Sequence, residues 1–324
     1  MQRRLFLRSA VAASTIPLCG VSDQPDLPVG SLLGKTPALT AAEQEAIVTA
    51  LGKKGTYSEA QATYNVPLPR NDLKVTVKGE PVPIPFGFGG WVAFKKTLDG
   101  KQTVMMSDTV LLEAEVNPLI DATHAAGLEV GAIHNHFFYE EPRIFYMHLH
   151  GMGDTVELAN KYAQAIRNTK LFPANQVAAT APSGTPALTG KELFELPALD
   201  GLVNYKGVVN GPTYKYTVGR DDVQIVAMGA EMTAAIGLNS WASFAGKQDA
   251  AHIAGDIAML EGEVNNVVKA LRKNKLEVVA LHHHMLGEQP RTVFLHYYGR
   301  GSAVELAKGF RAALDQLGKP GMQH

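Results

Sequence analysis

The sequence predicts an α+β protein made of two tandem homologous repeats. Each repeat is expected to be a mainly antiparallel sheet with a β-α-β-β-α core and helices on one face, and the two are expected to pack as a pseudo-twofold pair. Three observations lead to this class. The second half of the chain repeats the sequence pattern of the first half at a domain-sized offset. Within each copy the spacing of apolar residues alternates between strand-like and helical, and turn residues bound the predicted strands. With 324 residues, 46% of them hydrophobic, the chain is long enough for two ordinary cores.

The internal duplication is the clearest of these observations. With an offset of 148, residues 108–159 align with residues 256–307 without a gap, and 23 of the 52 aligned positions are identical. Ordinary residue usage would give about three identities by chance. Because a recent duplication would leave scattered and mostly apolar identities, a retained set rich in polar residues indicates constraint. The retained pairs include Asp108/Asp256, Glu113/Glu261, Glu115/Glu263, Asn117/Asn265, His134/His282, His136/His284, Glu140/Glu288, Pro142/Pro290, Arg143/Arg291 and His148/His296.

Each element of a copy has a local signal. Alternating apolar and polar residues predict strands, apolar residues at helical spacing predict helices, and Gly127 supplies a helix stop. In chain order, the first copy is predicted to hold strands over residues 73–78, 90–95 and 103–112, a helix over 115–126, a strand over 128–136, a turn over 139–142, a returning strand over 144–150 and a second helix after Gly153. The chain then divides into a leader over 1–30, a first repeat over 36–170, a linker over 171–184 and a second repeat over 185–318.

The leader has the features of an export signal of the twin-arginine type. A charged start with Arg3 and Arg4 precedes a short, mildly apolar run from Ser9 to Leu18. The run is too short to span a membrane as a helix, so we expect a periplasmic or secreted protein. Cys19 follows this run, but the bulky residue before it argues against lipid anchoring there.

Charge and cysteine content exclude several classes of partner and site. Lys and Arg number 30 against 31 Asp and Glu, a formal net charge of −1, and without the leader, which holds three arginines and two aspartates, the count is 27 against 29, or −2. This balance gives no electrostatic reason to expect nucleic acid or an anionic membrane as a partner. The single cysteine excludes an intramolecular disulfide and a multi-cysteine metal site.

Histidine carries the functional prediction. Eight of the 11 histidines fall in two windows, 134–150 and 282–296. His134 and His136 lie two apart on a predicted strand and therefore project from one face, and His148 and His150 do the same on the returning strand. The register expected from turns at Pro142 and Pro290 pairs His136 with His148, His134 with His150, His284 with His296 and His282 with Tyr298.

Three neutral imidazoles with an open position suit catalytic zinc, and imidazole also binds copper. We therefore predict a divalent transition metal, zinc before copper, held by the histidines of each repeat. Glu113 and Glu261, where a strand gives way to a helix, are the candidate catalytic carboxylates, as general base or as partner of a ligand histidine. The predicted metal ligands are His134, His136 and His148 in the first repeat and His282, His284 and His296 in the second.

Three functions remain open for such a protein. The first is an exported metal-binding protein that sequesters or senses metal in the periplasm. The second is a metal-dependent hydrolase or lyase, which a deep pocket around the histidines would favour over a shallow exposed face. The third is a metal-free ligand-binding or two-histidine catalytic pocket. A small-molecule or anionic ligand is the further partner that we expect.

Other histidines and both tryptophans have structural interpretations. His124, His252 and His324 have no matching histidine in the other copy and are expected on the surface. Trp91 and Trp241 are expected to anchor the core, with a place at a pocket rim as the alternative.

Retained arginines are expected to pair with nearby carboxylates. Arg70 with Asp72, like the matching pair in the second copy, is expected to form an ion pair at a strand entrance. Arg143 and Arg291 follow the turn proline, where they would hold a glutamate such as Glu140 or bind an anionic ligand.

The second copy contains the segment Leu281-His-His-His284-Met-Leu-Gly-Glu288-Gln-Pro290-Arg-Thr-Val-Phe-Leu-His296-Tyr-Tyr-Gly299. This segment, together with the Arg-x-Asp and Trp-x-x-Phe segments of both copies, resembles the bacterial LppY/LpqO conserved-region family, a domain of unknown function. The resemblance covers essentially the whole chain after the leader and implies an exported or lipid-anchored protein, with no established reaction. The first copy departs from the pattern at Phe137-Phe138-Tyr139 and carries the extra His150.

Overall fold

Two six-stranded sheets, one in each repeat, form the framework of the computed structural model, which describes residues 35–171 and 188–318. The ladders within both sheets are antiparallel. In sheet order, the first holds β1 (Thr56–Ser58), β2 (Thr63–Pro69), β5 (Gly89–Lys96), β6 (Thr103–Leu112), β9 (Ile144–Gly153) and β7 (Glu129–His134). The second holds β10 (Val208–Asn210), β11 (Thr213–Gly219), β14 (Asn239–Lys247), β15 (Ala250–Leu260), β17 (Thr292–Gly301) and β16 (Glu277–His282).

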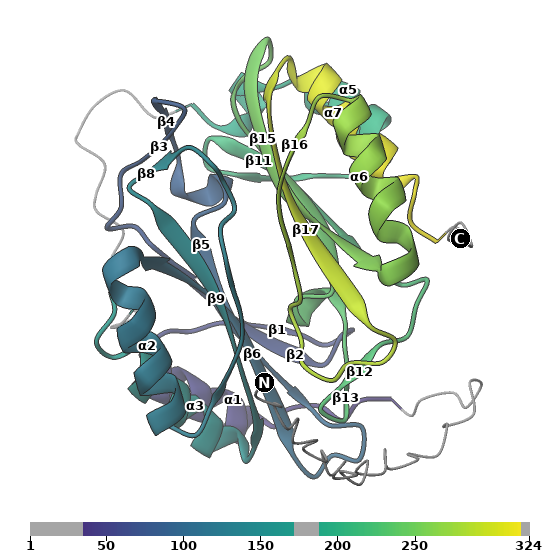
Figure 1. Cartoon of the computed structure of the whole chain (residues 1–324). Helices are drawn as coiled ribbons and strands as arrows, with labels where there is room; N and C mark the ends of the chain where they lie inside the picture. The colour runs from purple at the N-terminus through teal and green to yellow at the C-terminus, as the bar shows by residue number, and fades with distance from the viewer. Residues whose placement is uncertain (1–34, 172–187, 319–324) are drawn as a thin grey trace, which may run out of the picture. The chain divides into compact units, whose positions relative to one another are not determined.

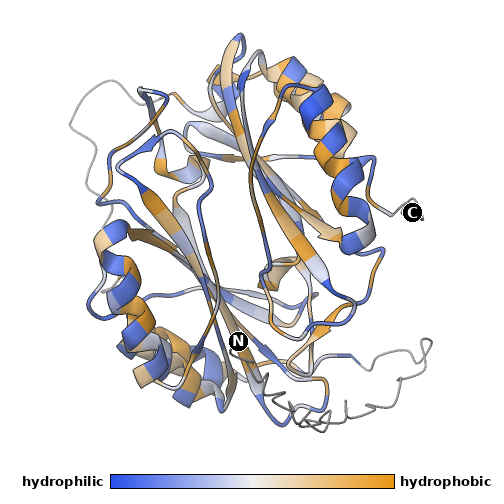
Figure 2. Cartoon of the chain, in the orientation of Figure 1, coloured by the Kyte–Doolittle hydropathy of each residue, from blue (hydrophilic) through white to orange (hydrophobic). Residues whose placement is uncertain are grey.

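Helices cover the outer face of each sheet (Figure 1). Their polar sides face water and their apolar sides pack on the strands, so both kinds of residue run along each outer helix in Figure 2. The first repeat holds α1 (Ala41–Leu51), α2 (Glu113–Ala125) and α3 (Thr155–Ile166), and the second holds α4 (Gly190–Leu193), α5 (Leu196–Val203), α6 (Val264–Lys273) and α7 (Ala303–Leu314). Each repeat therefore has its own core between helices and sheet.

The inner faces of the two sheets pack against the other repeat. For this reason β6 is buried at nearly every position and lacks the alternation of a strand with one wet face. Two further apolar clusters combine residues of both repeats, one around Phe86 and Tyr298 and one around Met106 and Phe294. The described part of the chain after residue 34 is accordingly one compact unit.

Short elements of each repeat pack on the sheet of the other repeat, and these reciprocal contacts relate the two repeats by a pseudo-twofold axis. The 3-10 helix η1 (Ile84–Phe86) of the first repeat packs on β14 of the second, and the 3-10 helix η2 (Ala234–Ile236) of the second packs on β2 and β5 of the first. The short elements are β3 (Val75–Val77), β4 (Glu80–Val82), η1 (Ile84–Phe86), β8 (Glu140–Glu141), β12 (Val226–Ala227), β13 (Ala230–Glu231), η2 (Ala234–Ile236) and η3 (Glu261–Glu263). The predicted class, α+β in two tandem repeats with mainly antiparallel sheets and a β-α-β-β-α core, is confirmed.

Several sequence predictions fall on segments without a described structure. The leader over 1–30, with its arginines and Cys19, lies outside the described residues, and so do His324 and nearly all of the linker over 171–184. Within residues 35–171 and 188–318, none of the helices combines the length and the apolar character that crossing a membrane requires.

Candidate metal centre between the repeats

Equivalent rows of side chains cross the middle of each sheet. Directly opposed residues of an antiparallel pair share a face, so each row projects to one side. The first row is Trp91, Asp108 and His148 on β5, β6 and β9, and the second is Trp241, Asp256 and His296 on β14, β15 and β17. The ring of His148 lies 4.1 Å from the ring of His284 in the other repeat, centroid to centroid, so both rows face the interface.

The predicted register of the histidine hairpin is wrong by four residues. His148 lies opposite Ala132, and His134 lies opposite Tyr146. The second repeat has the same shift, with His282 opposite Phe294. The connection is longer than a tight turn because it includes β8, which pairs with β3, and β7 carries an irregularity after Val130. Since the shift is even, the histidines remain on the predicted face.

The histidines of the two repeats meet in one cluster. Separate sites in each repeat were the expectation, but each histidine face lies against the other repeat. The ring centroids of His134 and His282 are 3.8 Å apart, and those of His136 and His296 are 3.7 Å apart. Within the first repeat, the Nε2 atoms of His134 and His148 are 2.9 Å apart. The predicted ligands therefore form a single buried centre, which both copies build.

Three groups of buried side chains in this cluster could hold a metal ion. The ligand atoms of each group lie within 4.8 Å of one another. The groups are His134, His148 and His282; His134, His136 and His296; and Asp256, His282 and His296. Two of them combine histidines of both repeats. Imidazole ligands with one carboxylate suit zinc and copper.

The protonation states of the cluster favour metal binding. Burial lowers the pKa of His134 to about 3. The pKa values of the other five predicted ligands are also well below the usual value, first because of burial and then because of neighbouring histidine charges. These ligands are His136, His148, His282, His284 and His296. These imidazoles are therefore neutral near pH 7, which is the form that coordinates metals.

Backbone carbonyls fix the orientation of two central imidazoles. Nδ1 of His148 lies 3.2 Å from the Ser107 carbonyl oxygen, and Nδ1 of His296 lies 3.1 Å from that of Gly255. Each Nδ1–H donates to its carbonyl, so Nε2 carries the lone pair and points into the cluster. Several other buried ring nitrogens have no hydrogen-bond partner among the described residues, including both of His136, His282 and His284. A bound ion would satisfy such atoms.

Asp108 and Asp256 are the carboxylates that the structure places with the histidines. Asp256 Oδ2 lies 3.2 Å from His284 Nε2, and Asp108 Oδ1 lies 3.9 Å from His148 Nδ1. Burial raises the pKa of Asp108 to about 7, against the opposing charge of Lys215. Burial and then the charge of Asp108 raise the pKa of Asp256 well above its usual value. The sequence marked both residues by their retention in the two copies but assigned neither a role.

Glu113 and Glu261, the predicted catalytic carboxylates, lie elsewhere. Both are exposed, at the starts of α2 and η3, and neither belongs to the three groups. Four residues of extended β6, about 14 Å, separate Asp108 from Leu112, the last residue before Glu113. This placement takes the two glutamates out of hydrogen-bonding reach of the cluster.

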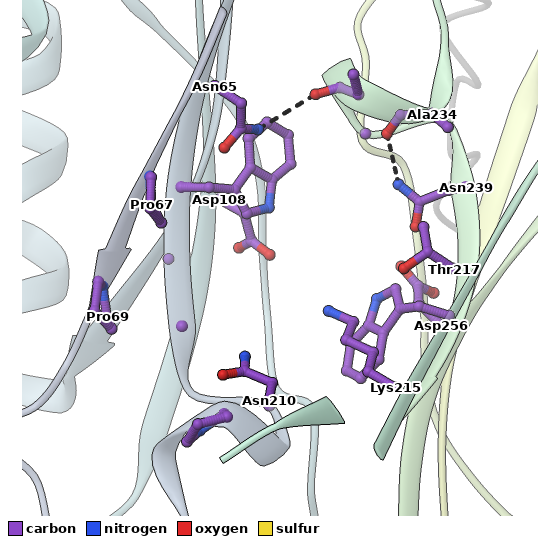
Figure 3. A pocket seen from close by; sticks show the side chains of 18 of the residues that line it. Asn65, Pro67, Pro69, Asp108, Asn210, Lys215, Thr217, Ala234, Asn239 and Asp256 are labelled. Carbon is purple, nitrogen blue, oxygen red and sulfur yellow. Dashed lines mark hydrogen bonds between the residues drawn. The ribbon is translucent and has the colours of Figure 1, made fainter. Parts of the chain in front are cut away.

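A cavity of about 720 Å³ opens beside the histidine cluster. Its lining includes His136 and His284 together with both aspartates of the rows. Figure 3 shows Asn65, Pro67, Pro69 and Asp108 on one wall and Lys215, Thr217, Asn239 and Asp256 on the wall opposite. The volume lies within the range of small-molecule sites. The histidines are thus reached from a pocket and not from a shallow face.

Both tryptophans line this cavity, which is the alternative expected for them, and Trp91 also packs against the apolar cluster around Met106 and Phe294. Trp91 and Trp241 are partly buried, each at the end of its row. A Cβ placed on Gly237 would lie 3.0 Å from the Trp91 ring, and one on Gly87 would lie 3.7 Å from the Trp241 ring. Each indole therefore reaches across to a glycine of the other repeat. At Gly237, where φ is +104°, glycine also supplies a backbone conformation that other residues avoid.

Two further histidines, His252 and His150, are buried in positions that the sequence does not predict. His252 was expected on the surface but is buried, with Nδ1 2.8 Å from the Tyr298 hydroxyl and Nε2 3.0 Å from Glu80. His150 is fully buried, has no hydrogen-bond partner among the described residues and has Tyr298 in its place in the second repeat. His124 is exposed, as expected.

Arg70, Arg143 and Arg220 form the expected ion pairs, whereas Arg291 forms none within residues 35–171 and 188–318. Arg70 and Asp72 pair side by side, with Nε 2.9 Å from Oδ1, and the second copy repeats the contact. The sequence did not show that Glu115 joins the network, 2.7 Å from the Arg70 guanidinium. Arg143 lies 4.0 Å from Glu140, which agrees with its expected pairing to that glutamate.

Comparison with known proteins places the chain in a family. No curated protein and no solved structure matches it. The sequence profile of the family described as Domain of Unknown Function (DUF1259), named DUF1529, matches residues 45–168 and 198–316, one region in each repeat. The predicted resemblance is confirmed as a tandem domain of unknown function, and the narrower name LppY/LpqO stays a prediction. The matched regions cover more than half of the chain, which therefore belongs to this family.

Proposed function

We propose that the shared centre binds a divalent transition metal, zinc before copper, and uses it for hydrolytic or lyase chemistry on a small molecule in the adjoining cavity. The observation that carries this proposal is the junction of two features. Buried groups of histidines with suitable ligand spacing open onto a pocket of about 720 Å³. His136 and Asp256 belong to both, since each is in a ligand group and lines the pocket.

The chain's own residues supply distinct roles in such chemistry. The histidines of the three groups, His134, His136, His148, His282 and His296, hold the ion in this proposal, and His284 adjoins them through Asp256. A bound ion supplies Lewis-acid activation of water or of a ligand oxygen. Asp108 lines the cavity and belongs to none of the three ligand groups, so it is the carboxylate left to accept a proton. In this proposal Asp108 replaces Glu113 and Glu261, the predicted general bases.

Elemental analysis of the chain, purified without a His-tag after export processing, tests the metal part. We expect one or two equivalents of zinc after incubation, lost in His282→Ala/His284→Ala and kept in His124→Ala, whose side chain is exposed outside the cluster. Absence of metal from the wild-type protein after incubation with zinc and then copper would overturn the proposal. The histidines would then form the metal-free pocket that the sequence left open.

Hydrolysis of 4-nitrophenyl acetate by the zinc-loaded protein tests the catalytic part. Asp108→Asn is expected to lower turnover at least about 100-fold while it keeps its zinc, as loss of a general base does. Glu261→Gln should keep wild-type turnover, because Glu261 is exposed and apart from the cluster. Equal turnover in wild type and Asp108→Asn would contradict the role of Asp108.

Metal storage without catalysis is the second candidate, and the number of ligands favours it. The three groups together contain five imidazoles and the Asp256 carboxylate, more ligands than the three that one catalytic ion needs. Two zinc equivalents without turnover of the ester would support storage.

A further inference from the structure

The ammonium group of Lys215 points into the cavity without a partner. Nζ of Lys215 lies 4.5 Å from the centre of the Trp241 ring. Across residues 35–171 and 188–318 it forms no hydrogen bond and no ion pair, and Figure 3 shows it aimed at the open space between the walls. Lys215 is partly buried, whereas the fully buried cations are paired: Lys95 donates to the Gln61 carbonyl, and Arg70 holds Asp72 and Glu115. The ammonium group of Lys215, unpaired among the described residues, therefore has no evident role in stabilising the fold.

The matching residue of the first repeat shows that the fold does not require a lysine there. Asn65 stands at the equivalent position, two residues before Pro67, as Lys215 stands before Thr217. The amide of Asn65 donates to the Ala235 carbonyl, 3.3 Å away, which is a structural contact between repeats. Lys215 replaces this contact with a charge directed into the pocket. The two walls are therefore chemically different.

The charges of the lining suit an anion once the centre holds its metal. Burial raises the pKa of both Asp108 and Asp256, so together they carry at most two negative charges. With both ionised, these aspartates and Lys215, the acidic and basic residues of the lining, have a net charge of −1. One divalent ion changes this net charge to +1. Burial lowers the pKa of Lys215 to about 8, so it remains mainly charged at pH 7. Neutral polar side chains also line the cavity, among them Thr56, Ser58, Asn65, Asn210, Thr217 and Asn239.

We infer that the cavity binds a hydroxylated organic anion whose carboxylate or phosphate group pairs with Lys215. The inference rests on the proposed function, because the metal offsets the two aspartates. The hydroxyls of the ligand meet the amide and hydroxyl side chains of the walls, and its charged end is directed toward the second repeat. Small organic acids and phosphorylated polyols share this chemistry and a size suited to about 720 Å³.

Tryptophan fluorescence gives a direct readout, because the chain has two tryptophans and both line the cavity. The probes are glucose, glucuronate and glucose 6-phosphate, which share a ring and differ in charge, titrated into zinc-loaded protein. We expect one or both anions to change the emission saturably and glucose to leave it unchanged. The two anions distinguish a carboxylate from a phosphate ligand. A Trp91→Phe background leaves Trp241, beside Lys215, as the sole reporter.

Lys215→Gln is expected to weaken binding of the anion at least tenfold, while Lys215→Arg retains most of it. Lys308→Gln removes the same charge from the outer face of α7 and should bind like wild type. Zinc content, measured on each variant, should stay unchanged. Failure of both anions to bind zinc-loaded wild type, or equal binding by Lys215→Gln, overturns the inference and leaves the metal centre standing. Failure of wild type to take up zinc instead overturns the proposed function.

Discussion

The two repeats agree around the shared centre and differ along the cavity beside it. Six histidines and two aspartates occupy equivalent positions, and their side chains meet between the sheets. On the cavity walls, Asn65 and Pro67 of the first repeat face Lys215 and Thr217 of the second. Because both copies contribute side chains to the centre, a substitution in either copy would disturb the whole centre. Each cavity wall belongs to one copy, so its residues can change without affecting the other wall. The comparison therefore separates metal ligation from ligand recognition.

Removing the buried arginine of each repeat should have the largest effect on stability. Arg220 pairs with Asp222 and Glu263, and Arg70 pairs with Asp72 and Glu115. The side chain of Glu263 is 4% exposed and that of Glu115 is 16% exposed, so water can compensate Glu115 better. Breaking a buried pair costs about 3–5 kcal/mol, and we expect Arg220→Ala near the upper end and Arg70→Ala near the lower end.

Denaturant unfolding of both variants measures this difference. Lys308→Ala is the control, because it breaks an exposed pair on α7 and should change the free energy of unfolding by less than about 0.5 kcal/mol. If both arginine variants lose the same free energy of unfolding, the exposure of the partner carboxylate does not determine how much stability the ion pair contributes.

Single histidine variants test whether the centre is shared. His134 and His282 are equivalent, and each belongs to two of the three ligand groups. We expect His134→Ala and His282→Ala to weaken zinc binding equally, by at least about 100-fold, since even an outer partner of a ligand is worth 10–100-fold. His150 belongs to none of the groups, so His150→Ala should weaken zinc binding by less than about tenfold. Competition with a chromophoric chelator measures all three affinities.

Separate, independent sites would give a different result. In that case His134→Ala would remove one zinc equivalent and leave the second-repeat site with wild-type affinity. A loss of affinity for every equivalent is what a centre built from both repeats requires.

The elements were predictable from sequence wherever one local signal acted alone. The strand over 103–112 has the predicted bounds, because turn residues precede it and the acidic start of a helix follows it. The helix predicted over 115–126 begins earlier, at Glu113, where the strand ends and leaves no linking residue. The short β8 escaped prediction because it exists only through pairing with β3, a contact distant in sequence.

The histidines were predictable as a set, but their assembly was not. A spacing of two places His134 and His136 on one face, yet it does not say what covers that face. Only the packing of the repeats shows that His282 lies against His134. Asp108 was retained in both copies, a signal that structural aspartates also give. Lys215 left no signal, because its position differs between the copies.

The smallest expected effect concerns two equivalent glutamates at helix starts. Glu43 caps α1 with Thr40, and Glu192 caps α4 with Thr189. Burial alone would raise the pKa of Glu43, but hydrogen bonds from Lys96, the Thr40 amide and other donors outweigh it and lower the pKa to about 2. Hydrogen bonds from Thr189 also lower the pKa of Glu192, which is fully exposed.

The sign of the pH effect follows from the lowered pKa. Charged Glu43 stabilises the fold fully above its unfolded pKa of 4.5, and this contribution is lost as the pH falls toward 2. We expect it to amount to about 1–2 kcal/mol after allowance for partial exposure. Urea unfolding at pH 5 and pH 2.5 should therefore show a smaller loss of stability in Glu43→Gln than in wild type, whereas Glu192→Gln follows wild type. If both variants lose stability as wild type does, the ion pair of Glu43 with Lys96 adds nothing to the cap, and the two repeats begin their first helices with equal strength.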